Sequence, residues 1–243
     1  KAALLDKVTK AVAELIKETS DVSISENQIN EDSDWRTTLQ HQIEQKIKLG
    51  DHRSYIPVIS GAPGIGKTSE VVQMSNDMDM GLVYIDTSTL DPEDVHGIPL
   101  AEEDKEKNVS VKFSMPKLYK MIEDKIKELD GKMDEHLKNK YKGDKEKIKA
   151  LKDRKYKFII FFDELNRTST KVFNGIRRVL LEKNFGDSMK VDPRSIMIAA
   201  INPEDNGASD LSDHLKDVVD VIHSAPNWSS TKKYMEAMNV TVD

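Results

Sequence analysis

The stretch "PVISGAPGIGKTSE", from Pro57 to Glu70, decides the fold of this 243-residue chain. A short β-branched run precedes three glycines and a proline, and a helix-forming run follows them. Glycine loses more backbone freedom on folding than any other residue, so this density of glycine indicates a place that requires bare backbone. The spacing Gly-x-x-x-x-Gly-Lys-Thr is that of a phosphate-binding loop.

The residue types in this loop fit a bound nucleoside triphosphate and Mg²⁺. Glycine lets inward-facing backbone N–H groups approach an anion closely. Lys67 would contact the β- and γ-phosphates, and the Thr68 hydroxyl would hold the metal. The predicted nucleotide-binding residues are Gly61, Ala62, Pro63, Gly64, Ile65, Gly66, Lys67, Thr68 and Ser69.

The flanks of the loop have the pattern that such a site needs. Residues 55–60 predict a short buried strand, and residues 68–78 predict an amphipathic helix. The positive end of that helix dipole would point at the same anion. A glycine-rich turn with a coincidental Gly-Lys-Thr is the alternative, and the two flanks make it the weaker one.

A second signal follows the apolar run from Phe158 to Phe162, which predicts a buried strand. Ligands of open α/β sheets bind beyond the carboxyl ends of the strands, so Asp163 and Glu164 would emerge beside the bound phosphate. Asp163 suits a role around the metal, and Glu164 suits activation of a water for attack on the γ-phosphate. A polar strand end that faces solvent is the alternative.

The composition limits the class of protein. There is no cysteine, which excludes disulfides and thiolate metal sites and is compatible with a cytoplasmic location. No run approaches the roughly 18 consecutive apolar residues of a membrane helix, and no secretory signal is visible, so we expect no membrane partner.

Predicted strands alternate with predicted helices, which indicates an α/β fold with three α/β/α layers around a parallel sheet.

Three segments in this order, "GAPGIGKT", "FIIFFDELNR" and "IMIAAINPE", resemble those of AAA+ ATPases, and specifically of the MoxR-like branch. The resemblance covers about residues 56–228 and includes the segment from Asp94 to Pro99. It implies a P-loop NTPase fold, hydrolysis of ATP with Mg²⁺, and an oligomeric ring that acts on a protein substrate or adaptor as a remodelling or assembly chaperone. It also implies that Asn202 is a polar sensor of the attacking water or the γ-phosphate, with a turn-forming Asn-Pro as the alternative.

Two departures from the AAA+ pattern bear on activity. Val218 stands where related ATPases carry an arginine that reaches the γ-phosphate of a neighbouring subunit, and losing such an arginine is costly. Only 20 residues follow His223, so we expect the helical lid domain to be short or absent. A slow or inactive nucleotide-binding assembly module is therefore the alternative function. The candidate substitutes for the trans arginine are Arg177, Arg178, Arg167 and Arg194, with Lys216 a weaker one.

The charge is distributed unevenly along the chain. From Lys117 to Lys157 there are 15 basic and 9 acidic residues, a local charge of +6 in a chain of net charge −6, so the rest carries −12. This stretch predicts a charged helical hairpin, interrupted at Gly131 and Gly143 and inserted into the core. Its basic and acidic residues are interleaved at helical spacing, which favours a solvated arm or a protein-binding hairpin over nucleic-acid contact.

These patterns divide the chain into three parts. Residues 1–53 are predicted to form two N-terminal helices and a linker. Residues 54–228 form the predicted AAA+ core, which contains the 117–157 insertion. Residues 229–243 are predicted to begin a short or truncated C-terminal helical part.

Overall fold

A computed structural model of the chain describes residues 35–49, 55–103, 107, 109–186, 189–202 and 219–224. The predicted helix at the start of the chain, Lys216, Val218 and the C-terminal helical part lie outside these residues. What the sequence predicts for them, and the domain boundaries, therefore stay predictions.

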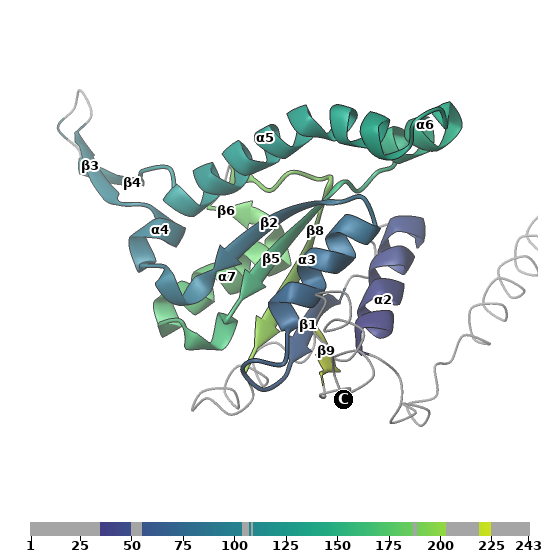
Figure 1. The fold of residues 1–243 in the computed structure, drawn as a ribbon. Coiled ribbons are helices and arrows are strands. Elements are labelled where there is room, and N and C mark those ends of the chain that lie inside the picture. Colours follow the sequence, from purple (N-terminus) through teal and green to yellow (C-terminus); the bar gives the residue numbers. More distant parts are fainter. Residues whose placement is uncertain are drawn as a thin grey trace, which may run out of the picture. The chain divides into compact units, whose positions relative to one another are not determined.

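The centre of the described chain is a five-stranded parallel sheet in the order β2-β5-β8-β1-β9 (Figure 1). The strands are β1 (Ile56–Ser60), β2 (Gly81–Asp86), β5 (Phe158–Asp163), β8 (Ser195–Ile201) and β9 (Val219–His223). Every residue of β5 and β8 is buried, as expected for central strands of a parallel sheet that is covered on both faces. The predicted parallel α/β fold is confirmed.

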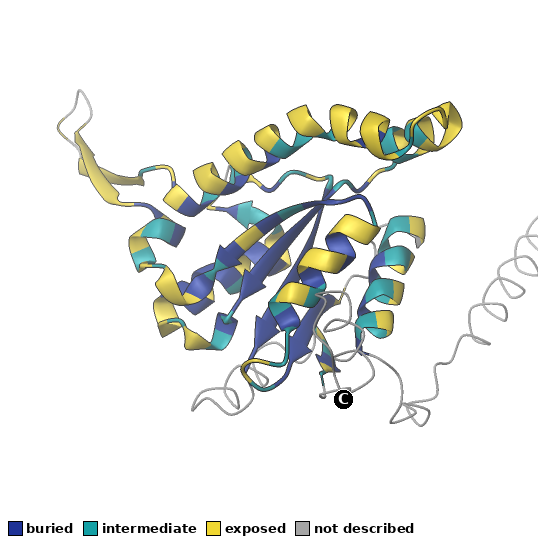
Figure 2. Ribbon diagram, viewed as in Figure 1, coloured by how far each residue is buried: buried dark blue, intermediate teal, exposed yellow. Residues whose placement is uncertain are grey.

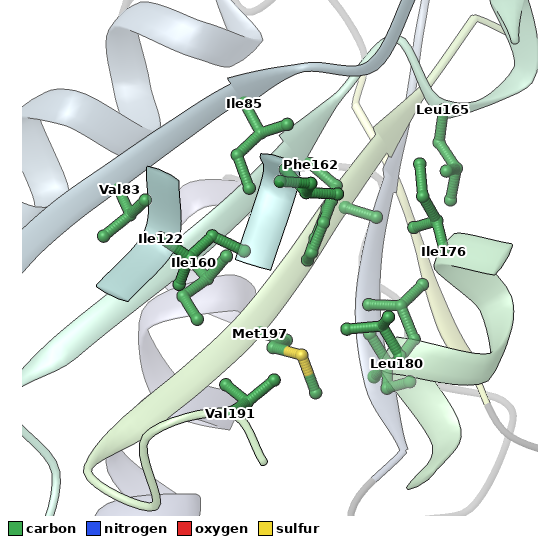
Figure 3. Close-up of a cluster of buried hydrophobic side chains, with 14 of the residues drawn as sticks. Val83, Ile85, Ile122, Ile160, Phe162, Leu165, Ile176, Leu180, Val191 and Met197 are labelled. Carbon is green, nitrogen blue, oxygen red and sulfur yellow. The ribbon is translucent and has the colours of Figure 1, made fainter. Parts of the chain in front are cut away.

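Helices cover both faces of the sheet (Figures 1 and 2). They are α2 (Trp35–Leu49), α3 (Lys67–Asp77), α4 (Pro92–His96), α5 (Lys117–Lys140), α6 (Lys145–Asp153) and α7 (Thr170–Glu182). Successive side chains of a strand point to opposite faces, so β5 contributes to two hydrophobic clusters. Ile160 and Phe162 pack with α4, α5 and α7 (Figure 3). Ile159 and Phe161 pack with α2 and α3. Within the described ranges, no helix combines the length and the apolar character that crossing a membrane requires.

The helix α2 packs on the sheet. Its residues Trp35, Leu39 and Ile43 are buried in the same cluster as α3. Arg36 on the neighbouring face of α2 forms an ion pair with Asp77 of α3, with 2.6 Å between Nη2 and Oδ2. The helix is thus part of the hydrophobic core, although the predicted boundary at residue 53 assigns it to the N-terminal part.

The charged stretch forms the long helix α5, a turn and the shorter helix α6. The helix α5 continues through Gly131, so the predicted interruption there is wrong. A glycine inside a helix costs only about 1 kcal/mol, and Leu118, Ile122 and Leu137 on either side of it are buried. The chain does turn at Gly143, which has a φ of 92°. Because α5 has a buried face, this stretch belongs to the core for part of its length.

Two antiparallel hairpins accompany the sheet. In the first, β3 (Pro99–Glu103) pairs with β4 (Val109–Phe113), and every residue of both strands is exposed (Figure 2). The second pairs β6 (Asn184–Phe185) with β7 (Met189–Lys190). The sequence of β4 alternates apolar and polar residues, whereas the sequence of β3 has no such alternation.

Asp79 connects the loop after α3 to the end of α5. Its carboxylate accepts hydrogen bonds from Lys140 Nζ and from the Tyr141 hydroxyl, each at 2.6 Å. Arg154 donates to the main-chain oxygens of Met78 and Asp79. Burial would raise the pKa of Asp79, but the hydrogen bonds and the nearby positive charges hold it below its ordinary value. The ionised carboxylate therefore stabilises the fold.

Asp79→Asn should lower the free energy of unfolding at pH 7 by about 1–3 kcal/mol, because it weakens the acceptor of two hydrogen bonds at a buried position. Asparagine tolerates the φ of 53° found here, so the backbone is preserved. Since the pKa is lower in the folded state, this stabilisation is present above the unfolded-state pKa and is lost as pH falls through the folded-state pKa. Urea unfolding of both proteins at neutral and at acid pH measures the difference.

Asp124→Asn is the matched control, because Asp124 is an exposed carboxylate on α5. It should change the free energy of unfolding very little at either pH. Equal effects of the two substitutions, or an Asp79 effect that persists unchanged at acid pH, would contradict this role for Asp79.

Candidate nucleotide-binding site

The loop between β1 and α3 forms an open cradle at the carboxyl edge of the sheet. A Cβ on Gly61 would lie 2.9 Å from the Ser224 main-chain oxygen, which is too close for a side chain, so the position requires glycine. Gly64 and Gly66 have φ angles of 79° and 90°, in the left-handed region that favours glycine. Within the described structure, nothing lies within 4 Å of a Cβ built on either residue. The loop therefore has room for an anion beside its backbone.

Lys67, the first residue of α3, is 8% exposed. Its Nζ donates to the main-chain oxygens of Gly61 and Ala62, at 2.6 and 3.0 Å, and to the Asn202 Oδ1 at 2.8 Å. These three neutral acceptors hold the ammonium in the loop. An anion that enters the cradle would offer it stronger, charge-assisted hydrogen bonds.

Thr68 and Asp163 meet across the mouth of the loop. The Thr68 hydroxyl donates to the Asp163 Oδ2 at 2.5 Å, and the Glu164 N–H donates to the Oδ1 at 2.9 Å. The buried Thr87 hydroxyl donates to the Asp163 main-chain oxygen at 2.6 Å. These contacts fix the Asp163 carboxylate beside the first turn of α3.

Negative charge gathers at this edge of the sheet. Asp86 and Asp163 are register partners at the ends of β2 and β5, and Glu164 follows directly. Partial burial raises the pKa of the Tyr84 phenol, and the charges of these three carboxylates raise it further. A divalent cation would be attracted to the negative charge at this edge.

Thr68 and Asp163 fit a Mg²⁺ ion that is bound together with substrate phosphates. In such sites one or two carboxylates bind the ion, and the phosphates supply further ligands. Thr68 and Asp163 offer a hydroxyl and a carboxylate, and the cradle leaves room for phosphate beside them. In the part of the chain that the structure describes, no group of three or more His, Cys, Asp or Glu side chains could hold a metal.

Glu164 occupies a strained turn after β5. Its φ is 55°, in the left-handed region, and the turn η2 (Leu165–Arg167) follows. Its carboxylate is paired with Arg167, with 2.7 Å between Oε1 and Nη1. Arg167, a candidate trans arginine from the sequence, therefore binds a carboxylate of its own chain in this state.

Asn166 is a site residue that the sequence reasoning missed. Its side-chain amide donates to the Asn202 main-chain oxygen at 2.7 Å and accepts from the Asn202 N–H at 3.0 Å. Asn202 itself is 2% exposed and is the acceptor for Lys67. Asn166 belongs to the Asp-Glu-Leu-Asn-Arg run. In that run the chemistry of phosphate hydrolysis suggests roles for Asp163 and Glu164 but none for Asn166.

The two adjacent arginines of α7 differ in their surroundings. The Nε of Arg177 is buried and has no hydrogen-bond partner among the described residues. Arg178 is half-exposed and pairs with Glu182, with 2.9 Å between Nε and Oε2. An unsatisfied buried donor typically costs about 1–3 kcal/mol, so Arg177 is the one that calls for an explanation.

Arg194, the fourth candidate for the trans arginine, lies at the amino ends of the strands, opposite the loop. It directly precedes β8, so β8 separates it from the carboxyl edge and the loop. Its guanidinium contacts carboxylate oxygens of Asp130 and Asp192, each at 2.8 Å, and these contacts raise its pKa. Its charge is thus already balanced within the chain.

The comparisons with known proteins are limited to folds. The sequence matches no protein-family profile and no curated protein. Solved structures of similar fold include a candidate ATPase from Cytophaga hutchinsonii, at 20% identity and a TM-score of 0.44, over 84% of this chain and 56% of that one. NtrX from Brucella abortus in complex with ATP has 15% identity and a TM-score of 0.43, over 98% of this chain and 47% of that one.

A mutant of RuvB from Thermotoga maritima has 12% identity and a TM-score of 0.47, over 85% of this chain and 52% of that one. This chain spans about half the length of these structures. Likenesses this distant carry no argument about activity. The assignment of an α/β P-loop fold rests on the strand order and on the geometry of the loop.

Proposed function

We propose that this chain is an ATP-binding and hydrolysing AAA+ ATPase of the MoxR-like type, which assembles into a ring and remodels or assembles a protein partner. One observation carries the ATPase part of this proposal. Four polar side chains from the ends of the neighbouring elements β1–α3, β5 and β8 form two contacts, Lys67 with Asn202 at 2.8 Å and Thr68 with Asp163 at 2.5 Å. The carboxyl edge of a parallel sheet is the place where such folds bind ligands.

Binding of ATP would use groups that the loop already presents. The backbone N–H groups of the loop would donate to the phosphates. Lys67 would exchange its bonds to the Gly61 and Ala62 oxygens for bonds to the β- and γ-phosphates. Thr68 and Asp163 are the residues that would hold Mg²⁺, which when bound neutralises charge on the phosphates.

Hydrolysis would need a base for the attacking water, and Glu164 is the carboxylate beside the metal-binding residues. For its Oε1 to accept the proton, the water would have to take the place of Arg167 at that oxygen. The Asn202 amide would orient that water or the γ-phosphate. The displaced Arg167 would still carry its positive charge near the site, where negative charge develops in the transition state.

A slow nucleotide-binding assembly module is the second candidate. The pairing of Glu164 with Arg167 favours it, because a base engaged in an ion pair is less available to water. The two candidates differ in turnover and agree on nucleotide binding. A rate that rises with protein concentration would favour the ring ATPase.

The charge of the α5–α6 hairpin supports a protein partner. Residues 138–157 hold ten basic and three acidic residues, whereas residues 117–137 hold five basic and six acidic ones. The two aromatic rings at the basic end are engaged, since Tyr141 donates to Asp79 and Tyr156 is 2% exposed. Because nucleic-acid bases stack on accessible rings, a negatively charged protein surface fits this end better than single-stranded nucleic acid.

Glu164→Gln should keep ATP binding and reduce turnover by about 10²–10⁴-fold, because it removes the base and preserves shape and hydrogen bonding. Steady-state phosphate release and binding of a fluorescent ATP analogue measure the two properties. Glu135→Gln, at an exposed position of α5, is the matched control and should behave like the wild type. Unchanged turnover of Glu164→Gln would refute this base, and a wild type that binds ATP without turnover would favour the slow module.

Alanine substitution should separate the two arginines of α7. In rings of the AAA+ type this helix lies near the subunit boundary, and of its two adjacent arginines only Arg177 has a buried guanidinium nitrogen without a hydrogen-bond partner among the described residues. We therefore expect Arg177→Ala to lower turnover by about 10³-fold, as for the loss of a trans arginine, and Arg178→Ala to change it little.

Mixing the inactive variants tests whether Arg177 acts across the boundary. A Glu164→Gln subunit keeps Arg177 and can complete the site of an Arg177→Ala neighbour, so mixtures should regain part of the turnover. Absence of recovery at every mixing ratio, in mixtures that demonstrably co-assemble, would contradict the trans role.

A further inference from the structure

The side chain of Asn166 pairs with the main chain of Asn202 as a strand would. The amide donates to the Asn202 oxygen at 2.7 Å and accepts from the Asn202 N–H at 3.0 Å, so both main-chain groups of one residue are satisfied by one side chain. The two residues are 36 positions apart in the sequence. The contact joins the turn η2, after β5, to the end of β8.

The end of β8 needs this contact because the sheet does not reach it. The β5–β8 register ends with Phe162 opposite Ala199, and the β1–β8 register ends with Ser60 opposite Ile201. Asn202 lies beyond the end of both registers, one residue after Ile201 and three after Ala199, and is nevertheless 2% exposed. Buried main-chain groups without a partner are strongly unfavourable, so the Asn166 amide takes the place of the missing strand.

The contact also reaches the phosphate-binding lysine. The Asn202 main chain is held by Asn166, and its side-chain Oδ1 accepts from Lys67 Nζ at 2.8 Å. Asn166 stands two residues after Glu164 on the same turn. One continuous set of bonds thus connects the turn that carries the base to Asn202 and to the loop lysine.

We propose that Asn166 is a positioning residue, which fixes the main chain of Asn202 and thereby aims the Asn202 amide at Lys67 and at the bound nucleotide. This inference rests on the proposed function, since it concerns the same nucleotide site. In this proposal Asn166 acts through Asn202, the residue that its side chain contacts.

The positioning role predicts a pattern of effects that a purely structural role of Asn166 does not. Asn166 binds the main chain of Asn202, which alanine at position 202 would retain. The function of Asn202 depends on its side chain, which alanine removes. Loss of Asn166 should therefore affect stability whether or not the Asn202 side chain is present, but it should affect turnover only when that side chain is present.

A double-substitution cycle of Asn166→Ala and Asn202→Ala measures both quantities in the full chain. We expect Asn166→Ala alone to lower kcat by about 10–100-fold, the range found for groups that orient a ligating residue. In the Asn202→Ala background the same substitution should leave kcat unchanged, while its effect on unfolding by urea should be the same in both backgrounds.

Two further variants keep the cycle interpretable. Asn166→Asp keeps the size of the side chain and its acceptor but removes the donor to the Asn202 oxygen, so it replaces Asn166→Ala if the alanine variant fails to fold. Asn139→Ala, at an exposed position of α5, is the matched control and should change neither quantity. If the wild type binds ATP without turnover, the dissociation constant of a fluorescent ATP analogue replaces kcat in the same cycle.

The outcomes separate this inference from the proposed function. Independent effects of the two substitutions on kcat, or an effect of Asn166→Ala on stability alone, would overturn the positioning role and leave the ATPase proposal intact. A wild type that binds no ATP analogue would overturn the proposed function and this inference with it. Non-additive kcat effects combined with additive stability effects would support both.

Discussion

The site depends on the pairing of three buried strands whose carboxyl ends lie at one edge of the sheet. The strands β5, β8 and β1 are buried on both faces, so a register shift of one residue would move each side chain to the opposite face and disrupt the packing of both hydrophobic clusters. The polar residues of the site lie at the carboxyl ends of these strands. Asp163 closes β5, Asn202 follows β8, and the glycine loop follows β1, which brings their side chains within hydrogen-bond distance.

Within the described structure, the charged groups of the site are held by internal partners. The Lys67 ammonium is held by the loop oxygens and by Asn202, and the Glu164 carboxylate is held by Arg167. Both arrangements use contacts that a nucleotide and its attacking water would replace with stronger or better-aligned ones. Under the proposed function, nucleotide binding and turnover would move these side chains, whereas the strands could stay in place.

The sequence predicts the parts of this site that depend on local pattern. The glycine spacing predicts the loop, and the apolar run before Asp163 predicts the central strand. Both patterns lie within a few consecutive residues, so they can be recognised without knowledge of the fold. The role of Asn166 depends on a contact between residues 36 positions apart, which no local pattern records. The continuity of α5 through Gly131 likewise depends on burial against the sheet, which overrides the low helix propensity of glycine.

The central claim is that the loop from Gly61 to Thr68 binds the phosphates of ATP, and the Lys67→Ala variant tests it most directly. The measurement is the dissociation constant of a fluorescent ATP analogue in the presence of Mg²⁺, with Lys120→Ala, at an exposed position of α5, as the matched control. The account predicts tight binding by the wild type and the control and loss of tight binding by Lys67→Ala, because the ammonium supplies the main point charge on the phosphates. Equal affinity of the wild type and Lys67→Ala would contradict it.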